Sequence, residues 1–438
     1  MEINRLTILI DVSSQHHRNV GDVAMLQVAL QRFRCLWPER PLLVLSDAPE
    51  RLATLCPQAT YVPTAGRFLW GYALSGRLVR HLPAALVGPW DVADRLVRYQ
   101  MPGVRNFVQN LKVATKPALR QDLGAFRLAM AQADCLVATG GGYLTDEFPD
   151  FAMAVLSTLE WAIQLKKPTL MVGQGIGPLQ NSRLRRKAST ILPRVDLIMV
   201  REKRTSLPLL RSLGVSAERI LATGDDAIAL AYTAHPPTLG QGIGINLRQA
   251  PYAGLTAHHI MAVGQAVGQV AAQVQAPLLA VPTSAVDADQ AIIEQVWATA
   301  APRLGMQTRM VYPLDTPLAV IQQVGRCRVM LTGSYHAGVF ALAQGIPVVG
   351  LAKSQYYQDK FHGLAEQFGI GCTVLALDDS NLKEKVTDAL LHAWHTAEQT
   401  QAPLLAAARQ QMAAGEQAYQ QARGLVDSRR EARTASVF

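Results

Sequence analysis

The sequence predicts an α/β fold in which two Rossmann-like halves, each built on a parallel sheet, face a central cleft. Short apolar runs bounded by Gly, Pro or Asp alternate with longer stretches of helical periodicity, as in βαβ units. This alternation stops at a Pro- and Gly-rich stretch between residues 235 and 242 and then starts again. With 438 residues, 49% of them hydrophobic, the chain is too long for one core and apolar enough for two.

The first half is expected over residues 1–234. Its strands are predicted at Leu6–Ile10, Leu42–Leu45, Cys135–Ala138, Thr169–Val172 and Leu197–Val200, with helices at Asp22–Phe33 and Phe151–Leu165. Because parallel strands end at one edge of a sheet, the loops that follow these strands are expected to line the cleft.

Residues 66–127 interrupt the alternation of the first half. They are basic and apolar and contain few acidic residues. We expect a pair of surface helices here, and the alternative is an insertion that caps the cleft or contacts a membrane surface.

The second half is expected over residues 242–380, followed by a helical segment over residues 381–438. Strands are predicted at Ile243–Asn246, Pro277–Val281, Met310–Tyr312, Val329–Leu331 and Pro347–Leu351, with helices at His258–Gln275, Ala288–Ala301 and Ala337–Gln344. The Ala-, Gln- and Arg-rich end is expected to form a helix that packs back across both halves. A loose tail is expected after about Arg423.

Composition favours an anionic partner and a reducing compartment. The formal charge is +9, and the basic residues are spread without interleaved aromatics, which argues against nucleic acid. The five cysteines are widely spaced and predict neither disulfides nor a zinc site. Residues 1–11 read as a first strand rather than a signal peptide, and no stretch is long enough to span a membrane, so we expect a cytoplasmic protein.

Asn19-Val20-Gly21-Asp22 follows the first predicted strand and opens a helix. Free backbone N–H groups and the helix dipole make such a position an anion site. Asp22 is therefore a candidate catalytic residue, and the alternative is that it is the N-cap of the helix.

Two glycine-rich segments follow the next strands of the first half. Gly140, Gly141 and Gly142 come directly after Cys135–Ala138, and Gly173-Gln174-Gly175 comes after Thr169–Val172. Neither segment has the dinucleotide fingerprint or the phosphate loop with its lysine, so no nicotinamide or ATP cofactor is predicted. We expect both to line the cleft, and a tight turn without a ligand is the alternative for the second.

Charged pairs end the first half. Arg201-Glu202 and Asp225-Asp226 follow further strand-like runs. Two adjacent carboxylates supply too few ligands for a dedicated metal site, so we expect Asp225 and Asp226 to have structural or hydrogen-bonding roles and predict no metal.

In the second half, charged and aromatic residues again follow the strands. Arg248 ends the first strand there, where a guanidinium can hold a phosphate or carboxylate. His336 lies at a strand-to-helix turn after Ser334 and Tyr335, which favours a functional histidine over a core one. Two lysines and two tyrosines follow the next strand and are candidates to hold an anion, the alternative being a solvated surface loop. These are Lys353, Tyr356, Tyr357 and Lys360.

Taken in order, these motifs resemble the polysaccharide pyruvyl transferase family over roughly residues 5–370. The shared features are Asn-x-Gly-Asp at 19–22, the glycine run at 140–142, Gly-Gln-Gly-Ile-Gly-Pro at 173–178, Arg201-Glu202, Leu213-Gly214-Val215 leading to Asp225-Asp226, and His336 followed by Gly345-Ile346-Pro347. The resemblance implies a GT-B-like fold and transfer of pyruvate from phosphoenolpyruvate, as co-substrate without a cofactor, to two hydroxyls of a sugar. The acceptor would be a cell-surface polysaccharide or its lipid-linked precursor, reached in the cytoplasm or at the inner face of the membrane.

The resemblance also implies residue roles. His336 would act at the donor as an acid or a phosphate ligand, and Asp22 would be a candidate base. The substrate-binding residues would be Asn19, Gly21, Gly140, Gly141, Gly142, Gln174, Gly175, Arg201, Arg248, Ser334, Tyr335, Lys353, Tyr357 and Lys360. The family commonly has Arg two residues before the histidine, where this chain has Ser334, and we hypothesise that Lys353 or Lys360 supplies that charge. The alternatives are a nucleotide-sugar-dependent glycosyltransferase on the same scaffold and a non-catalytic glycan-assembly protein.

Overall fold

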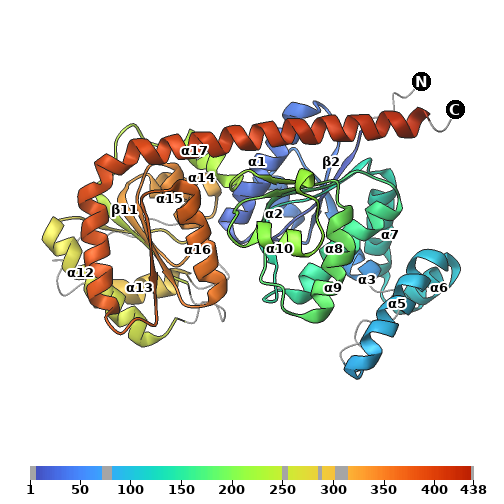
Figure 1. Cartoon of the computed structure of the whole chain (residues 1–438), viewed down its shortest axis with the longest axis horizontal. Coiled ribbons are helices and arrows are strands. Elements are labelled where there is room, and N and C mark those ends of the chain that lie inside the picture. The colour runs from blue at the N-terminus through green and yellow to red at the C-terminus, as the bar shows by residue number, and fades with distance from the viewer. Residues whose placement is uncertain (1–5, 72–80, 249–254, 285–288, 301–313, 436–438) are drawn as a thin grey trace.

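Two parallel sheets organise the computed structural model, which describes residues 6–71, 81–248, 255–284, 289–300 and 314–435 (Figure 1). The first sheet contains β1 (Ile8–Asp11), β2 (Leu42–Ser46), β3 (Thr60–Pro63), β4 (Cys135–Ala138), β5 (Gly141–Leu144), β6 (Thr169–Ile176), β7 (Leu197–Val200) and β8 (Ile220–Ala222). Its order is β3-β2-β1-β4-β6-β7-β8, with β5 paired to β6. The second contains β9 (Gly242–Asn246), β10 (Leu278–Ala280), β11 (Cys327–Thr332), β12 (Val348–Ala352) and β13 (Cys372–Ala376), in the order β10-β9-β11-β12-β13. The predicted fold class is therefore confirmed.

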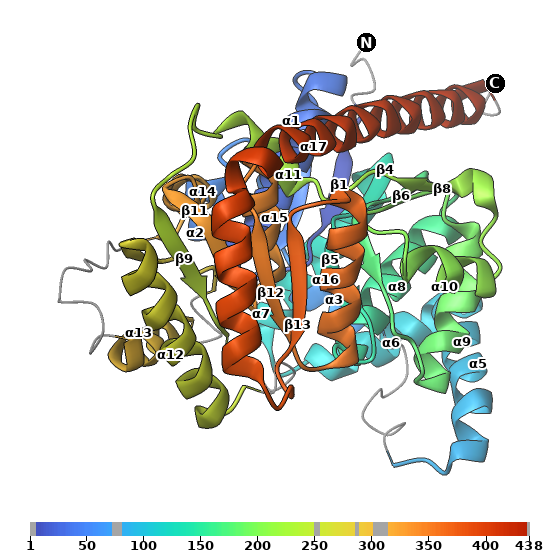
Figure 2. The ribbon, with the colours of Figure 1, turned by 60° about the vertical axis from the view of Figure 1, so that its left-hand side comes forward.

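Helices flank both sheets, as expected for βαβ units (Figure 2). In the first half these are α1 (Val20–Leu36), α2 (Pro49–Leu55), α3 (Ala65–Gly71), α5 (Ala84–Gln100), α6 (Pro102–Val113), α7 (Pro117–Gln132), α8 (Pro149–Gln164), α9 (Ser182–Ile191), α10 (Ser206–Ser212) and α11 (Ala227–Thr233). The second half contributes α12 (Ala257–Val274), α13 (Asp289–Ala300), α14 (Pro317–Val324), α15 (Tyr335–Ala343), α16 (Gln355–Phe368) and α17 (Leu382–Ala435). Within the described residues, no helix is both long enough and apolar enough to cross a membrane.

The sheets differ from the sequence prediction at the glycine-rich segments. Gly141 belongs to β5 and pairs with Gln174, so β6 continues to Ile176 where we expected a loop after Val172. The expected loop is a strand because β5 gives the end of β6 a hydrogen-bonded neighbour. The strand predicted at Met310–Tyr312 lies outside the described residues.

The two halves share a continuous apolar contact near the start of α1. Val20, Ala24 and Met25 of α1 belong to the same buried cluster as Phe340 of α15. The backbone N–H of Val20 also donates to the carbonyl of Thr283, at 2.9 Å. These contacts place the start of α1 against the second sheet, at the carboxyl ends of its strands.

The last helix, α17, is 54 residues long and runs across both halves (Figures 1 and 2). The prediction that it packs back is confirmed, but the prediction of a loose tail after Arg423 is wrong. Val426 is fully buried, and Asp427 accepts a hydrogen bond from Trp37 at 3.0 Å. The apolar contacts of the first half therefore hold the helix in place beyond Arg423.

The described residues of the 66–127 segment, namely 66–71 and 81–127, form helices at the end of the first half that lies away from the second half, with α5 and α6 projecting from it (Figure 1). The described part of the segment therefore does not cap the cleft. We call α5 and α6 the arm. Glu160 of α8 attaches the arm to the first half, because its carboxylate lies 2.8 Å from Arg95 and 3.6 Å from Arg98, both on α5.

Candidate active site

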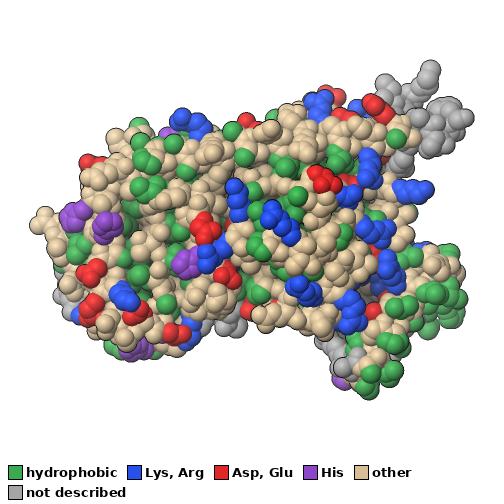
Figure 3. Space-filling view, in the orientation of Figure 1, with side chains coloured by type: hydrophobic (Ala, Val, Ile, Leu, Met, Phe, Trp, Pro, Cys, Tyr) green, Lys and Arg blue, Asp and Glu red, His purple; other side chains and the backbone are tan. Residues whose placement is uncertain are grey.

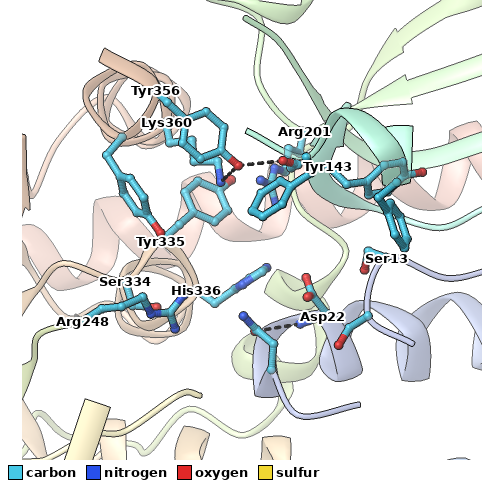
Figure 4. A pocket seen from close by; sticks show the side chains of 16 residues that line it. Ser13, Asp22, Tyr143, Arg201, Arg248, Ser334, Tyr335, His336, Tyr356 and Lys360 are labelled. Carbon is cyan, nitrogen blue, oxygen red and sulfur yellow. Dashed lines mark hydrogen bonds between the residues drawn. The ribbon is translucent and has the colours of Figure 1, made fainter. Parts of the chain in front are cut away.

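A pocket of about 260 Å³ lies where the carboxyl ends of the two sheets approach each other (Figure 4). Both halves contribute side chains to it, as expected for a crevice of an open α/β sheet. The lining residues are Ser13, Ser14, Asn19, Asp22, Gly142, Tyr143, Phe148, Phe151, Arg201, Arg248, Ser334, Tyr335, His336, Tyr356, Tyr357 and Lys360.

The start of α1 forms one wall of this pocket. Asn19 is the N-cap, and its side-chain oxygen accepts from the backbone N–H groups of Gly21 and Asp22, at 3.0 and 3.3 Å. The alternative that Asp22 is the cap is therefore wrong, since Asp22 lies in the first turn and lines the pocket. Burial raises the pKa of Asp22 to about 6, although Arg201 and Lys360 oppose the rise.

Gly21 allows His336 to approach α1. A Cβ on Gly21 would lie 1.9 Å from Cγ of His336, so any other residue at position 21 would displace the imidazole ring. Gly21 does not line the pocket and contributes by making room.

His336 lies in the first turn of α15 and is 8% exposed. Its Nε2 atom is 3.7 Å from Oδ2 of Asp225 and has no hydrogen-bond partner among the described residues. Burial lowers the pKa of His336 well below its usual value, and Arg201 and Lys360 lower it further. In the ligand-free pocket at neutral pH the imidazole is therefore uncharged, so it can accept a proton or donate its single N–H.

Arg201 and Arg248 enter the pocket from opposite halves, and each is paired with a buried carboxylate. Nη1 of Arg201 lies 3.1 Å from Asp225, and its guanidinium lies over the Tyr335 ring, 4.2 Å from the centroid. Nε of Arg248 donates to Asp289 at 3.2 Å. These partners hold both guanidinium groups in fixed orientations.

Lys360 of α16 is the third cation that lines the pocket. Its ammonium group donates to the hydroxyl of Tyr356 and lies 3.8 Å from the centroid of that ring. The Tyr356 hydroxyl in turn donates to the carbonyl of Gly142 at 2.7 Å, which connects the two halves across the pocket. Burial and the nearby Arg201 lower the pKa of Lys360 well below its usual value, which a bound anion would reverse.

Lys353 does not line the pocket, contrary to the prediction. Its ammonium group is 2.9 Å from Oδ1 of Asp378, on the segment between β13 and α17. Of the two lysines considered as replacements for the family arginine, only Lys360 reaches the pocket.

Arg248 lies close to Ser334, which occupies the position where the family commonly has an arginine. The hydroxyl of Ser334 is 3.0 Å from that of Thr283, and Nη2 of Arg248 donates to the same Thr283 hydroxyl at 2.9 Å. One threonine therefore joins Arg248 to Ser334, and Arg248 supplies positive charge on this wall of the pocket.

Four more of the predicted substrate-binding residues do not line the pocket, namely Gly140, Gly141, Gln174 and Gly175. The prediction that they contact the substrate in this pocket is corrected accordingly. A Cβ on Gly140 would lie 2.3 Å from the carbonyl oxygen of Gly173, and one on Gly175 would lie 2.8 Å from Nε of Arg201. The side-chain amide of Gln174 donates to two carbonyls of the 138–139 segment, at 3.0 and 2.8 Å. These residues allow the 138–140 segment and Arg201 to pack closely against β6, behind the pocket.

The paired carboxylates have different surroundings. Asp226 accepts hydrogen bonds from Arg32 and from Tyr419 of α17, so it has the structural role that we expected. Asp225 is 3% exposed and lies behind both Arg201 and His336. Within the described residues, no group of three or more His, Cys, Asp or Glu side chains is placed to hold a metal ion.

Five lining residues were not predicted, namely Ser13, Ser14, Tyr143, Phe148 and Phe151. Ser13 and Ser14 follow β1 closely, and Tyr143 follows the glycine run, so the strand-end rule could have found them. Phe148 and Phe151 lie at the start of α8, and their apolar side chains give no indication of a binding site in the sequence.

Comparisons with known proteins identify the family and the fold. The family model for polysaccharide pyruvyl transferase matches residues 19–354. The amylovoran biosynthesis protein AmsJ of Erwinia amylovora is 26% identical over 115 residues, which cover 25% of this chain and 26% of AmsJ. The match therefore spans about a quarter of that relative.

Solved structures show the same fold at low identity. A putative UDP-N-acetylglucosamine 2-epimerase from Listeria monocytogenes has a TM-score of 0.53 at 14% identity, with 92% of this chain and 94% of that one covered. S. aureus MnaA in its UDP co-structure has a TM-score of 0.53 at 11% identity, with the same coverage. The glycotransferase of kitacinnamycin has a TM-score of 0.50 at 13% identity, covering 97% and 99%. The fold is thus of the GT-B type, and because the family model matches most of its length, the chain belongs to the polysaccharide pyruvyl transferase family.

Proposed function

We propose that this pocket transfers pyruvate from phosphoenolpyruvate to two hydroxyls of a sugar, forming a ketal on a polysaccharide or its lipid-linked precursor. The convergence of Arg201, Arg248 and Lys360 on one pocket of about 260 Å³ carries the proposal. Phosphoenolpyruvate carries about three negative charges, because its phosphate pKa2 is near 6 and its carboxylate is ionised at neutral pH. These three side chains direct positive charge at the donor, although Asp225 and Asp289 already pair with the two arginines.

The proposed reaction has two steps in which atoms and charge balance. A proton adds to C3 of phosphoenolpyruvate and one sugar oxygen bonds to C2, which gives a tetrahedral phosphoketal. The bond from C2 to the phosphate oxygen then breaks, the second sugar oxygen bonds to C2, and phosphate leaves with the second hydroxyl proton. The products are one ketal, whose methyl group is the former C3, and one inorganic phosphate.

The surroundings of Asp22 suggest a role opposite to the one implied by the resemblance. Asp22, with a pKa of about 6, is protonated more readily than an ordinary aspartate, and a bound trianion favours that protonated form. We assign to it delivery of the proton to C3. His336 is neutral before the donor binds, and we assign to it acceptance of the hydroxyl proton or donation of its N–H to the donor.

The acceptor side of the proposed reaction has aromatic side chains. Phe148 is 36% exposed, and the Tyr143 and Phe151 rings lie 5.2 Å apart, centroid to centroid, at 70°. Mixed apolar and polar walls suit a sugar ring, which presents both kinds of surface. The name of AmsJ, a protein of amylovoran biosynthesis, supports a polysaccharide acceptor.

A ligand-stability screen tests this proposal. Phosphoenolpyruvate should raise the melting temperature of the protein, since a ligand at about 100 times its Kd adds about 2.7 kcal/mol of stability. UDP and GDP should leave it unchanged, and phosphate should be released when a sugar acceptor is added. Stabilisation by UDP or GDP instead would favour a nucleotide-sugar-dependent glycosyltransferase, in line with the UDP co-structure of MnaA. No response to any of them, and no phosphate release, would contradict an enzymatic role for the pocket.

A further inference from the structure

The arm formed by α5 and α6 exposes an apolar surface. Among the described residues, fifteen large hydrophobic side chains are exposed, and seven of them lie within residues 84–113. Figure 3 shows hydrophobic side chains gathered over this arm, at the lower right. A concentration of this kind marks a binding surface, because soluble proteins seldom leave contiguous apolar patches in water.

The exposed side chains follow helical spacing, which orients them outward together. On α6, Val104, Phe107 and Leu111 are 41%, 69% and 67% exposed. The opposite face of the helix carries Gln109, which donates to the carbonyl of Leu69 of α3, at 3.5 Å. The helix thus turns Gln109 and the fully buried Val113 inward, while three large apolar residues face outward, where an ordinary surface helix has polar side chains.

The α5 helix also exposes apolar side chains. Val92 and Leu96, four residues apart on one side of α5, are 67% and 45% exposed. Arg95 and Arg98 are held on the inward side by Glu160 of α8. The polar contacts that attach the arm therefore leave its apolar side uncovered by the described residues.

The net charge of the arm indicates the chemistry of its partner. The arm, residues 84–113, contains four Lys and Arg and two Asp, and Lys116 and Arg120 follow it at the start of α7. Both carboxylates are paired, Asp91 with Arg183 at 2.8 Å and Asp94 with Arg98. A second copy of this surface would repel it, whereas anionic phospholipid headgroups would attract it while the apolar side chains enter the acyl boundary.

We propose that the outer face of α5 and α6 docks on the surface of an anionic lipid bilayer. The arm is joined to the pocket by α8, whose start carries Phe148 and Phe151 and whose Glu160 holds α5. At 1.5 Å per residue, Phe148 and Glu160 are about 18 Å apart along that helix. A docked arm would hold the pocket close to the bilayer, where lipid-linked substrates reside, and the docking itself is independent of which group the pocket transfers.

Co-sedimentation of the full chain with vesicles tests the docking. With phosphatidylcholine vesicles containing about 30% phosphatidylglycerol, the protein should sediment, and with phosphatidylcholine alone it should remain mostly in solution. Raising salt to about 1 M, where the Debye length is about 3 Å, should weaken the binding. The assay contains neither donor nor acceptor, so its outcome is separate from that of the transferase proposal.

A double variant localises the contact. Phe107→Glu with Leu111→Glu should weaken binding to the anionic vesicles by at least about tenfold. The matched control, Met261→Glu with Leu318→Glu in the second half, changes residues that are 49% and 48% exposed and should bind like the wild type. Because all four side chains point to solvent, both variants should keep the wild-type melting temperature.

Three results would overturn the proposal. The first is a wild-type chain that stays in solution with both kinds of vesicle. The second is a Phe107→Glu, Leu111→Glu variant that binds like the wild type. The third is a lipid-free dimer in sedimentation velocity that the same variant dissociates, because the arm would then be an interface between two copies of this chain.

Discussion

The backbone of Gly21 in α1 lies directly against the imidazole of His336 in α15, so the two halves meet beside the pocket that His336 lines. A Cβ at position 21 would be 1.9 Å from Cγ and 2.1 Å from Nδ1 of that ring. The position of His336 therefore depends on a glycine more than three hundred residues earlier in the chain.

We expect Gly21→Ala to displace His336 and to lower kcat by about a hundredfold, since misplacement of a catalytic group by about 1 Å costs that much. Steady-state kinetics with phosphoenolpyruvate would measure the loss. Gly124→Ala is the matched control, because a Cβ there meets nothing within 4 Å and the residue lies in α7. Wild-type activity in Gly21→Ala would contradict a role for the His336 ring.

Removing the positive charge of Lys360 should weaken donor binding. Lys360→Met should raise KM for phosphoenolpyruvate by about 10- to 100-fold, because a charge-assisted contact contributes about 1.5–3 kcal/mol. Lys353→Met removes the same charge outside the pocket, where Lys353 is paired with Asp378, and should leave KM unchanged. Equal effects of the two substitutions would show that only the overall charge matters.

The raised pKa of Asp22 predicts a pH-dependent cost in stability. The pKa is about 6 in the folded protein and about 3.9 in the unfolded chain. The contribution of Asp22 is fully present below about pH 3.9 and is lost as pH rises through about 6. Asp22→Asn should therefore be more stable than the wild type at pH 8, by up to about 3 kcal/mol, and the difference should shrink towards pH 5.

Urea unfolding at the two pH values would measure this difference. If Asp22 is the proton donor, Asp22→Asn should also lose nearly all activity, and wild-type kcat should fall as pH rises through the pKa of the donor-bound enzyme. An Asp22→Asn protein that is less stable than the wild type at pH 8 would contradict the raised pKa.

The attachment of the arm to α8 depends on Glu160. This carboxylate is 2% exposed and lies 3.1 Å from Lys187 as well as close to Arg95 and Arg98. Glu160→Gln should lower the free energy of unfolding by about 3 kcal/mol, because it removes the counter-ion of the largely buried Lys187. Glu366→Gln, which removes a pair with Arg204 at the surface, should change it by less than about 1 kcal/mol in the same urea titration.

The sequence predicted the parts of the fold that depend on local pattern. The buried strands β1, β4 and β7 are continuous apolar runs, and periodicity identified the helices α1 and α8 that follow β1 and β5. It did not predict β5, because Gly141 and Gly142 have little strand propensity and pair with β6 only once the sheet has formed. The end of α17 was missed for a similar reason, since only contacts such as Trp37 with Asp427 hold it.

Most of the pocket could be predicted because side chains after parallel strands meet at one edge. Arg201, Arg248 and His336 follow β7, β9 and β11, and all three line the pocket. Lys353 obeys the same rule after β12 but turns away to Asp378, a choice that depends on a residue of another segment. Distant partners of this kind cannot be read from local spacing.

The long helix α17 acts as a strut between the two halves. Its Leu404 is buried in the cluster that includes Phe340, and its Tyr419 donates to Asp226 of the first half at 3.0 Å. Widening the crevice would therefore require α17 to bend or to lose its contacts with one of the halves. Pro403 offers the least costly hinge, since it lacks the N–H of an ordinary helical turn. A segment that contributes no side chain to the pocket, among the residues described, is thus one of the contacts that limit how far the two pocket walls can separate.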